Sequence, residues 1–98
     1  MEITYKSKKI QKLCTEPKVA ERSYGSEMAE KIHMRIDQIT AIDTVEMMIQ
    51  CRIGRCHPLT QNRKGQYAMD LVHPYRLVFE KHGNKVQIAH IIEIIDDH

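Results

Sequence analysis

The hydrophobic period of this chain changes near its middle, and that change limits the fold more than any other feature. Before Cys56, apolar residues recur every three or four positions, which indicates helices with one buried face. The clearest such run consists of Met28, Ile32, Ile36 and Ile39. After Cys56, apolar residues recur every second position, which indicates strands. Helices followed by consecutive strands predict an α+β fold.

The first half of the chain also contains signals for where elements begin. Alternation over residues 3–5 predicts a short opening strand. Ser7 can cap the helix that follows, and Glu16-Pro17 ends that helix and starts another. Asp43, with Glu46 three residues later, has the spacing of a capping box and predicts a further short helix. We therefore expect two to three N-terminal helices.

The second half predicts a sheet that the helices cover on one face. Residues 67–72 and 75–80 alternate, and His73-Pro74 separates the two runs. Gly83-Asn84 predicts the next hairpin turn. The run 86–95 is apolar on both faces and predicts a central strand. We expect a mainly antiparallel sheet with its other face open.

Length and composition fit one soluble globular domain spanning residues 1–98, with 42% hydrophobic and 29% charged residues. No apolar run approaches the roughly 20 residues of a membrane-spanning helix. The N-terminus lacks the apolar stretch of a secretory signal, so we expect a cytoplasmic protein. Three cysteines in no paired spacing favour reduced thiols, although Cys56 and His57 are adjacent and could supply two metal ligands.

Positive charge is concentrated in the middle of the chain, although the net charge is only +2. No acidic residue lies between Met47 and Met69. The basic and titratable residues of this stretch are Arg52, Arg55, His57, Arg63 and Lys64. Such a stretch is either a solvated loop or a patch that binds phosphate.

Arg76 is the candidate phosphate clamp. Its neighbours Tyr75 and Leu77 point to the core in the predicted strand, so Arg76 must point to the open face. An arginine on a rigid sheet can hold two phosphate oxygens with its planar fork. The alternative is a surface arginine that pairs with Glu80 or Glu93.

Histidines at two places could supply proton transfer. His57 begins the predicted sheet and His98 ends the chain. Phosphodiester cleavage needs a base at the attacking 2′-hydroxyl and an acid at the departing 5′-oxygen. Together with Arg76, the two histidines would form a metal-free ribonuclease site. Asp96 and Asp97 could act as a base or bind a metal, or could simply be solvated.

Several segments in this order resemble toxins of the RelE/HigB type, within the RelE/ParE superfamily. They are Cys56-His57-Pro58-Leu59, Arg63-Lys64-Gly65-Gln66-Tyr67, His73-Pro74-Tyr75-Arg76-Leu77-Val78-Phe79 and the terminal Glu93-Ile94-Ile95-Asp96-Asp97-His98. The resemblance implies a RelE-like fold, with two to three helices against a small, curved sheet. It also implies a helix-turn-helix antitoxin of the HigA type, through which the toxin would reach operator DNA. The implied activity is cleavage of messenger RNA in the ribosomal A site, without metal or cofactor.

The resemblance assigns the catalytic roles to His57, Arg76, Asp96 and His98. The basic stretch supplies Arg52, Arg55, Arg63 and Lys64 as the candidate RNA-binding residues. Two positions depart from the family pattern. Thr60 stands where a lysine is common, and Asp97 stands where a tyrosine is usual. Both changes remove groups that could contact RNA, and Asp97 adds negative charge. The alternatives are a ParE-type inhibitor of DNA gyrase and a toxin-fold protein that mainly binds its antitoxin.

Overall fold

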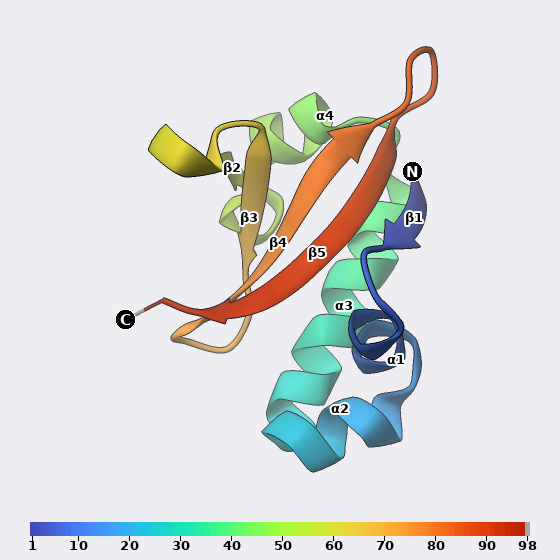
Figure 1. Cartoon of the computed structure of the whole chain (residues 1–98), viewed down its shortest axis with the longest axis vertical. Helices are drawn as coiled ribbons and strands as arrows, with labels where there is room; N and C mark the ends of the chain where they lie inside the picture. Colours follow the sequence, from blue (N-terminus) through green and yellow to red (C-terminus); the bar gives the residue numbers. More distant parts are fainter. Residues whose placement is uncertain (98) are drawn as a thin grey trace.

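The computed structural model describes residues 1–97 and shows helices packed against a five-stranded sheet (Figure 1). The α-helices are α1 Lys8–Thr15, α2 Pro17–Tyr24, α3 Ser26–Ala41 and α4 Val45–Gln50. The strands are β1 Glu2–Tyr5, β2 His57–Pro58, β3 Gln66–Asp70, β4 Tyr75–His82 and β5 Ile88–Asp96. Two short 3-10 helices, η1 Ile53–Arg55 and η2 Gln61–Arg63, flank β2. The α+β class predicted from the change of period is confirmed.

The strand order in the sheet is β1-β5-β4-β3-β2. β1 runs parallel to β5, and the other neighbours are antiparallel. The sheet is therefore mainly antiparallel, as expected, and β5 is internal, as its two apolar faces predicted. β4 and β5 are long and strongly twisted (Figure 1). The pairing of β4 with β5 contains an irregularity at Val78/Phe79.

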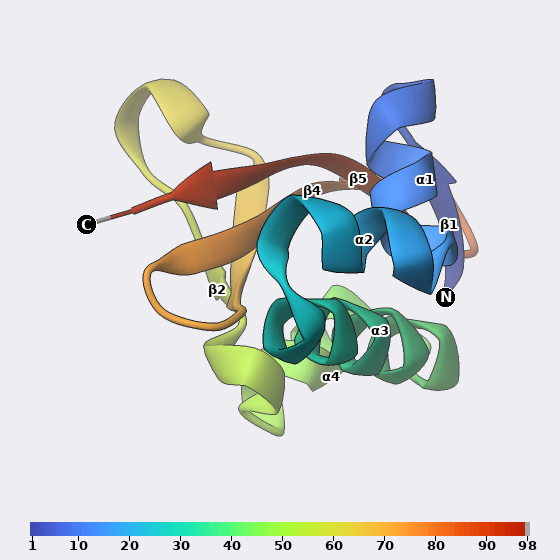
Figure 2. The same ribbon diagram turned by 90° about the horizontal axis from the view of Figure 1, so that it is seen from below.

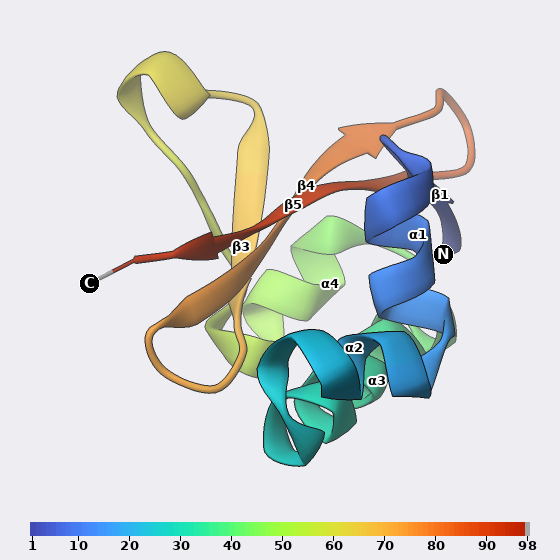
Figure 3. The same cartoon turned by 60° about the horizontal axis from the view of Figure 1, so that its bottom comes forward.

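The core lies between the sheet and the helices, which Figures 2 and 3 show on one side of β4 and β5. Leu77, Phe79 and Ile91 point into it from the sheet and are fully buried. Phe79 also stacks on Tyr67, with ring centroids 5.6 Å apart. Since Leu77 faces the core, the adjacent Arg76 points to the opposite face of β4, where sequence periodicity placed it.

Two predicted details of the helices differ from the structure. Thr44, not Asp43, caps α4, because α4 begins at Val45 and the Thr44 hydroxyl accepts a hydrogen bond from the Met47 N–H at 3.1 Å. Four α-helices form where two to three were expected, because Gly25 adopts φ +90° and separates α2 from α3. The predicted Ser7 cap is confirmed by its bond from the Ile10 N–H. Within residues 1–97, no helix is both long and apolar enough to cross a membrane.

Candidate anion-binding site

Arg76 lies on β4 between Asp70 of β3 and Ile95 of β5. Its guanidinium contacts two carboxylates. Arg76 Nη1 is 3.0 Å from an Asp97 oxygen, and Arg76 Nε is 3.8 Å from an Asp70 oxygen. The acids next to the predicted phosphate clamp are therefore Asp70 and Asp97, rather than Glu80 or Glu93.

Asp70 is shared by two arginines from different elements. Arg55, the last residue of η1, donates to the Asp70 carboxylate through both Nε and Nη2, the latter at 3.2 Å. The hydrogen bond and the charge of Arg55 hold the pKa of Asp70 below its usual value of 3.8, and the charge of Arg76 adds to this effect. Asp70 is therefore ionised near neutral pH. Two guanidinium groups thus converge on one oxyanion.

A cavity of about 160 Å³ opens beside this pair of arginines. Its lining includes Arg55, Asp70, His73, Tyr75, Arg76 and Asp97. Pockets that enclose a whole small-molecule ligand usually measure roughly 300 Å³ or more. The size of the cavity and its arginines therefore suit a single anionic group, such as a phosphate within a longer chain, rather than a whole nucleotide.

His57 lies in β2, opposite Ala68 of β3, and is partly exposed. Its Nδ1 is 2.7 Å from the backbone carbonyl oxygen of Arg55. Because a carbonyl oxygen only accepts, Nδ1 must carry the proton in this contact, and Nε2 remains available to accept one. This tautomer is the one that a general base requires.

Arg35 of α3 supports the site, and sequence reasoning missed it. Its side chain is almost completely buried, at 9% exposure. Arg35 Nε donates to the backbone carbonyl of Asp70 at 2.7 Å, and Nη1 donates to Gln38 at 2.9 Å. A Cβ at Gly54 of η1 would lie only 2.8 Å from Arg35 Nε. Arg35 therefore holds β3 and packs closely on η1, the two elements that carry Asp70 and Arg55.

The other predicted RNA-binding residues are dispersed. Arg63 Nη1 is 2.8 Å from both Gln66 and Glu93, so its side chain reaches from β3 to β5 across β4. Glu93 is the β5 partner of Val78, which is fully buried although it lies on the face away from the helices. Lys64 and Arg52 are exposed, and within residues 1–97 neither forms an ion pair.

The end of β5 lies beside the turn between β3 and β4 (Figure 1). Asp96 is the last residue of β5 and is paired with Tyr75. The Asp97 N–H donates to the Pro74 carbonyl at 3.0 Å. His98, the predicted second proton-transfer group, lies outside the described residues. Among residues 1–97, no cluster of three or more His, Cys, Asp or Glu side chains is placed to hold a metal ion.

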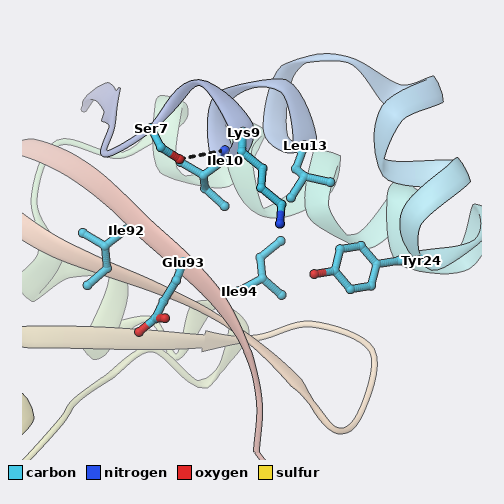
Figure 4. A pocket seen from close by; sticks show the side chains of 8 residues that line it. All are labelled: Ser7, Lys9, Ile10, Leu13, Tyr24, Ile92, Glu93 and Ile94. Atoms are coloured by element: carbon cyan, nitrogen blue, oxygen red, sulfur yellow. Dashed lines mark hydrogen bonds between the residues drawn. The ribbon is translucent and has the colours of Figure 1, made fainter.

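A second cavity of about 180 Å³ lies between the N-terminal helices and β5 (Figure 4). It is lined by Ser7, Lys9, Ile10, Leu13, Tyr24, Ile92, Glu93 and Ile94. Its lining contains one lysine and one glutamate and is otherwise made of aliphatic side chains, Ser7 and Tyr24. Among residues 1–97, no arginine or histidine lines this second cavity, and none of the predicted catalytic or RNA-binding residues does.

Comparison with known proteins gives a structural match only. No family model matches the sequence, and no similar curated protein was found. The structure is similar to a YoeB/ParE toxin from Agrobacterium tumefaciens, with a TM-score of 0.62 over 100% of both chains and 16% sequence identity. The chain therefore has the fold of that toxin, and the RelE/ParE-like fold implied by the sequence resemblance is confirmed.

Proposed function

We propose that this protein is the toxin of a type II toxin-antitoxin pair and acts in the cytoplasm as a ribosome-dependent endoribonuclease. The observation that carries the proposal is the convergence of Arg55 and Arg76 on one carboxylate beside a small cavity. His57 does not line this cavity, but its ring contacts the backbone carbonyl of Arg55. Two guanidinium groups around one anionic group can stabilise the extra negative charge that a phosphodiester carries in its pentacoordinate transition state.

In this proposal each residue has a defined role. His57 Nε2 takes the proton of a ribose 2′-hydroxyl, whose oxygen then bonds to the adjacent phosphorus while the bond to the 5′-oxygen breaks. Arg76 and Arg55 stabilise the negative charge that accumulates on the phosphoryl oxygens. His98 donates a proton to the departing 5′-oxygen. This role rests on the family resemblance, which also places Asp96 beside His98 in the terminal catalytic pair. The products are a 2′,3′-cyclic phosphate and a free 5′-hydroxyl.

Induction in cells, followed by mapping of messenger RNA ends, tests the activity. The wild-type chain should arrest growth and create new ends within translated regions. A double variant, His57→Ala with Arg76→Ala, should lose both effects. Removal of one group that stabilises a developing oxyanion typically lowers the rate by about 10²- to 10³-fold. Growth arrest by the wild type without new RNA ends would contradict the proposal.

A matched control substitutes the same two residue types at positions away from the candidate site. His33→Ala with Arg22→Ala removes one histidine and one arginine from exposed positions on α3 and α2. This variant should cleave as the wild type does. If it also loses cleavage, the loss in the site variant would reflect reduced folding or net charge rather than chemistry.

A second candidate is a non-enzymatic inhibitor of DNA gyrase of the ParE type. It is favoured by the acidic groups at the site, because Asp70 and Asp97 neutralise the charge of Arg55 and Arg76. A chain with weakened catalysis that mainly binds its antitoxin fits the same observation. Inhibition of gyrase supercoiling by purified protein, unchanged in the His57/Arg76 double variant, would favour the gyrase inhibitor.

The proposal also includes a partner. The toxin fold implies an antitoxin, and the sequence resemblance implies one of the helix-turn-helix HigA type that carries the complex to operator DNA. Co-expression with the protein of the adjacent reading frame should relieve growth arrest and give a stable complex. Failure of any neighbouring protein to bind or to relieve arrest would contradict this part of the proposal.

A further inference from the structure

We infer that the Asp97 carboxylate occupies, on Arg76, the place of a substrate phosphate, and that it acts as a displaceable competitor within the chain. The inference deepens the proposed function and rests on it for the identity of the ligand as RNA. It makes Asp97 a determinant of how tightly the site binds RNA, rather than a residue that takes part in bond breaking.

The contacts of Arg76 support this role for Asp97. Arg76 Nη1 lies 3.0 Å from the Asp97 carboxylate, within the range of a charge-assisted hydrogen bond. Both residues line the 160 Å³ cavity. A phosphate oxygen that bound this edge of the guanidinium would need the same N–H group, so the carboxylate and the phosphate compete for it.

Of the two carboxylates that contact Arg76, that of Asp97 is the one that can move away from it. Asp70 belongs to β3 inside the sheet, and Arg55 holds its carboxylate through two donors. Asp97 follows the last residue of β5, and its side chain is 46% exposed, against 29% for Asp70. Its backbone is anchored separately, through the N–H that donates to Pro74. The Asp97 side chain can therefore turn toward solvent without breaking a strand pairing, whereas Asp70 cannot leave Arg55 so easily.

A double-mutant cycle on the full chain tests the competition. The ligand is a fluorescein-labelled decauridylate, and its dissociation constant is measured by fluorescence anisotropy at low salt. Asp97→Asn should bind about threefold more tightly than the wild type, because a partly exposed ion pair of this kind opposes the ligand by a factor of roughly two to five. In the Arg76→Ala background, Asp97→Asn should change the dissociation constant little.

Asp43→Asn is the control for net charge. Asp43 precedes α4 and is exposed, and it contributes to none of the contacts around Arg76. Thermal unfolding of each variant checks that it is folded, and Asp97→Ala should repeat the effect of Asp97→Asn. A further titration with inorganic phosphate as competitor should displace the oligonucleotide more effectively from Asp97→Asn than from the wild type.

Three results would overturn the inference. The first is an equal gain in affinity for decauridylate from Asp97→Asn with and without Arg76. The second is an equal gain in affinity from Asp43→Asn, and the third is no gain in affinity from Asp97→Asn. Failure of the proposed function would give another result. RNA cleavage in cells would be missing, while the double-mutant cycle would still show coupling between Asp97 and Arg76. Conversely, cleavage in cells without coupling would leave the function intact and remove the inference.

Discussion

Arg35 of α3 donates a hydrogen bond from Nε to the backbone carbonyl of Asp70 at 2.7 Å, and so joins the longest helix to the strand at the candidate site. Because Arg35 is nearly buried, Arg35→Ala leaves an unsatisfied carbonyl and an unfilled space. We expect the free energy of unfolding to fall by about 2–3 kcal/mol. Denaturant unfolding measures this, with exposed Arg22→Ala as control; a similar loss in both variants would contradict the assigned role.

Gly54 is a second point of support for the same arginine. It adopts φ +58°, and a Cβ there would lie 2.8 Å from Arg35 Nε. We expect Gly54→Ala to lower the free energy of unfolding by about 1–2 kcal/mol, from backbone strain and from the displaced guanidinium. The part due to the guanidinium should disappear in an Arg35→Ala background. Strict additivity of the two substitutions in denaturant unfolding would show that the contact has no energetic effect.

The sequence allowed the layers of this fold to be predicted, because apolar periodicity is local. The period of two placed Leu77 in the core and Arg76 on the opposite face, and both positions agree with the structure. The two apolar faces of the run 86–95 likewise indicated that β5 is internal. Such predictions need only the neighbours of each residue along the chain.

The partners within the site could not be predicted in this way. Arg35 lies three residues after Ile32 and four before Ile39, so helical spacing places it on the apolar face of α3. Its contact with Asp70 joins residues 35 apart in sequence, and the spacing does not identify that partner. Asp70 reads as the polar position of an alternating strand. That Arg55 and Arg76 meet at Asp70 depends on the path of η1 and on strand register. No local pattern specifies either.

The loss of unfolding free energy at acidic pH should depend on Asp70. Its pKa in the folded chain is depressed, chiefly by Arg55, so its contribution is present above the usual value of 3.8 and is lost as the pH falls through the lower folded value. Asp70→Asn should therefore lower stability at pH 6 and flatten the decline below about pH 4. Unfolding free energies between pH 6 and pH 2.5 test this. A decline at acidic pH as steep as that of the wild type would refute the assignment.

Two adjacent cations should contribute differently to RNA binding. Lys64 is exposed, whereas Arg63 already pairs with Glu93 at 2.8 Å. Removal of a cation that binds one phosphate reduces the slope of log affinity against log salt by roughly 0.7 for a single strand. We therefore expect Lys64→Gln to reduce the slope by about this amount with decauridylate, and Arg63→Gln to reduce it less. The reverse order would show that Arg63 exchanges Glu93 for phosphate on binding.

The three cysteines should react at very different rates, which tests the packing of the core around the site. Burial raises the pKa of Cys14 to about 12 and that of Cys56 to about 11, while Cys51 is exposed at the end of α4. Since the thiolate is the reactive form, a disulfide reagent at pH 8 should modify Cys51 quickly and the buried pair only after unfolding. Cys51→Ser should abolish the fast phase. Fast modification that persists in Cys51→Ser would mean that Cys14 or Cys56 is accessible, and that the layer of helices against the sheet opens in solution.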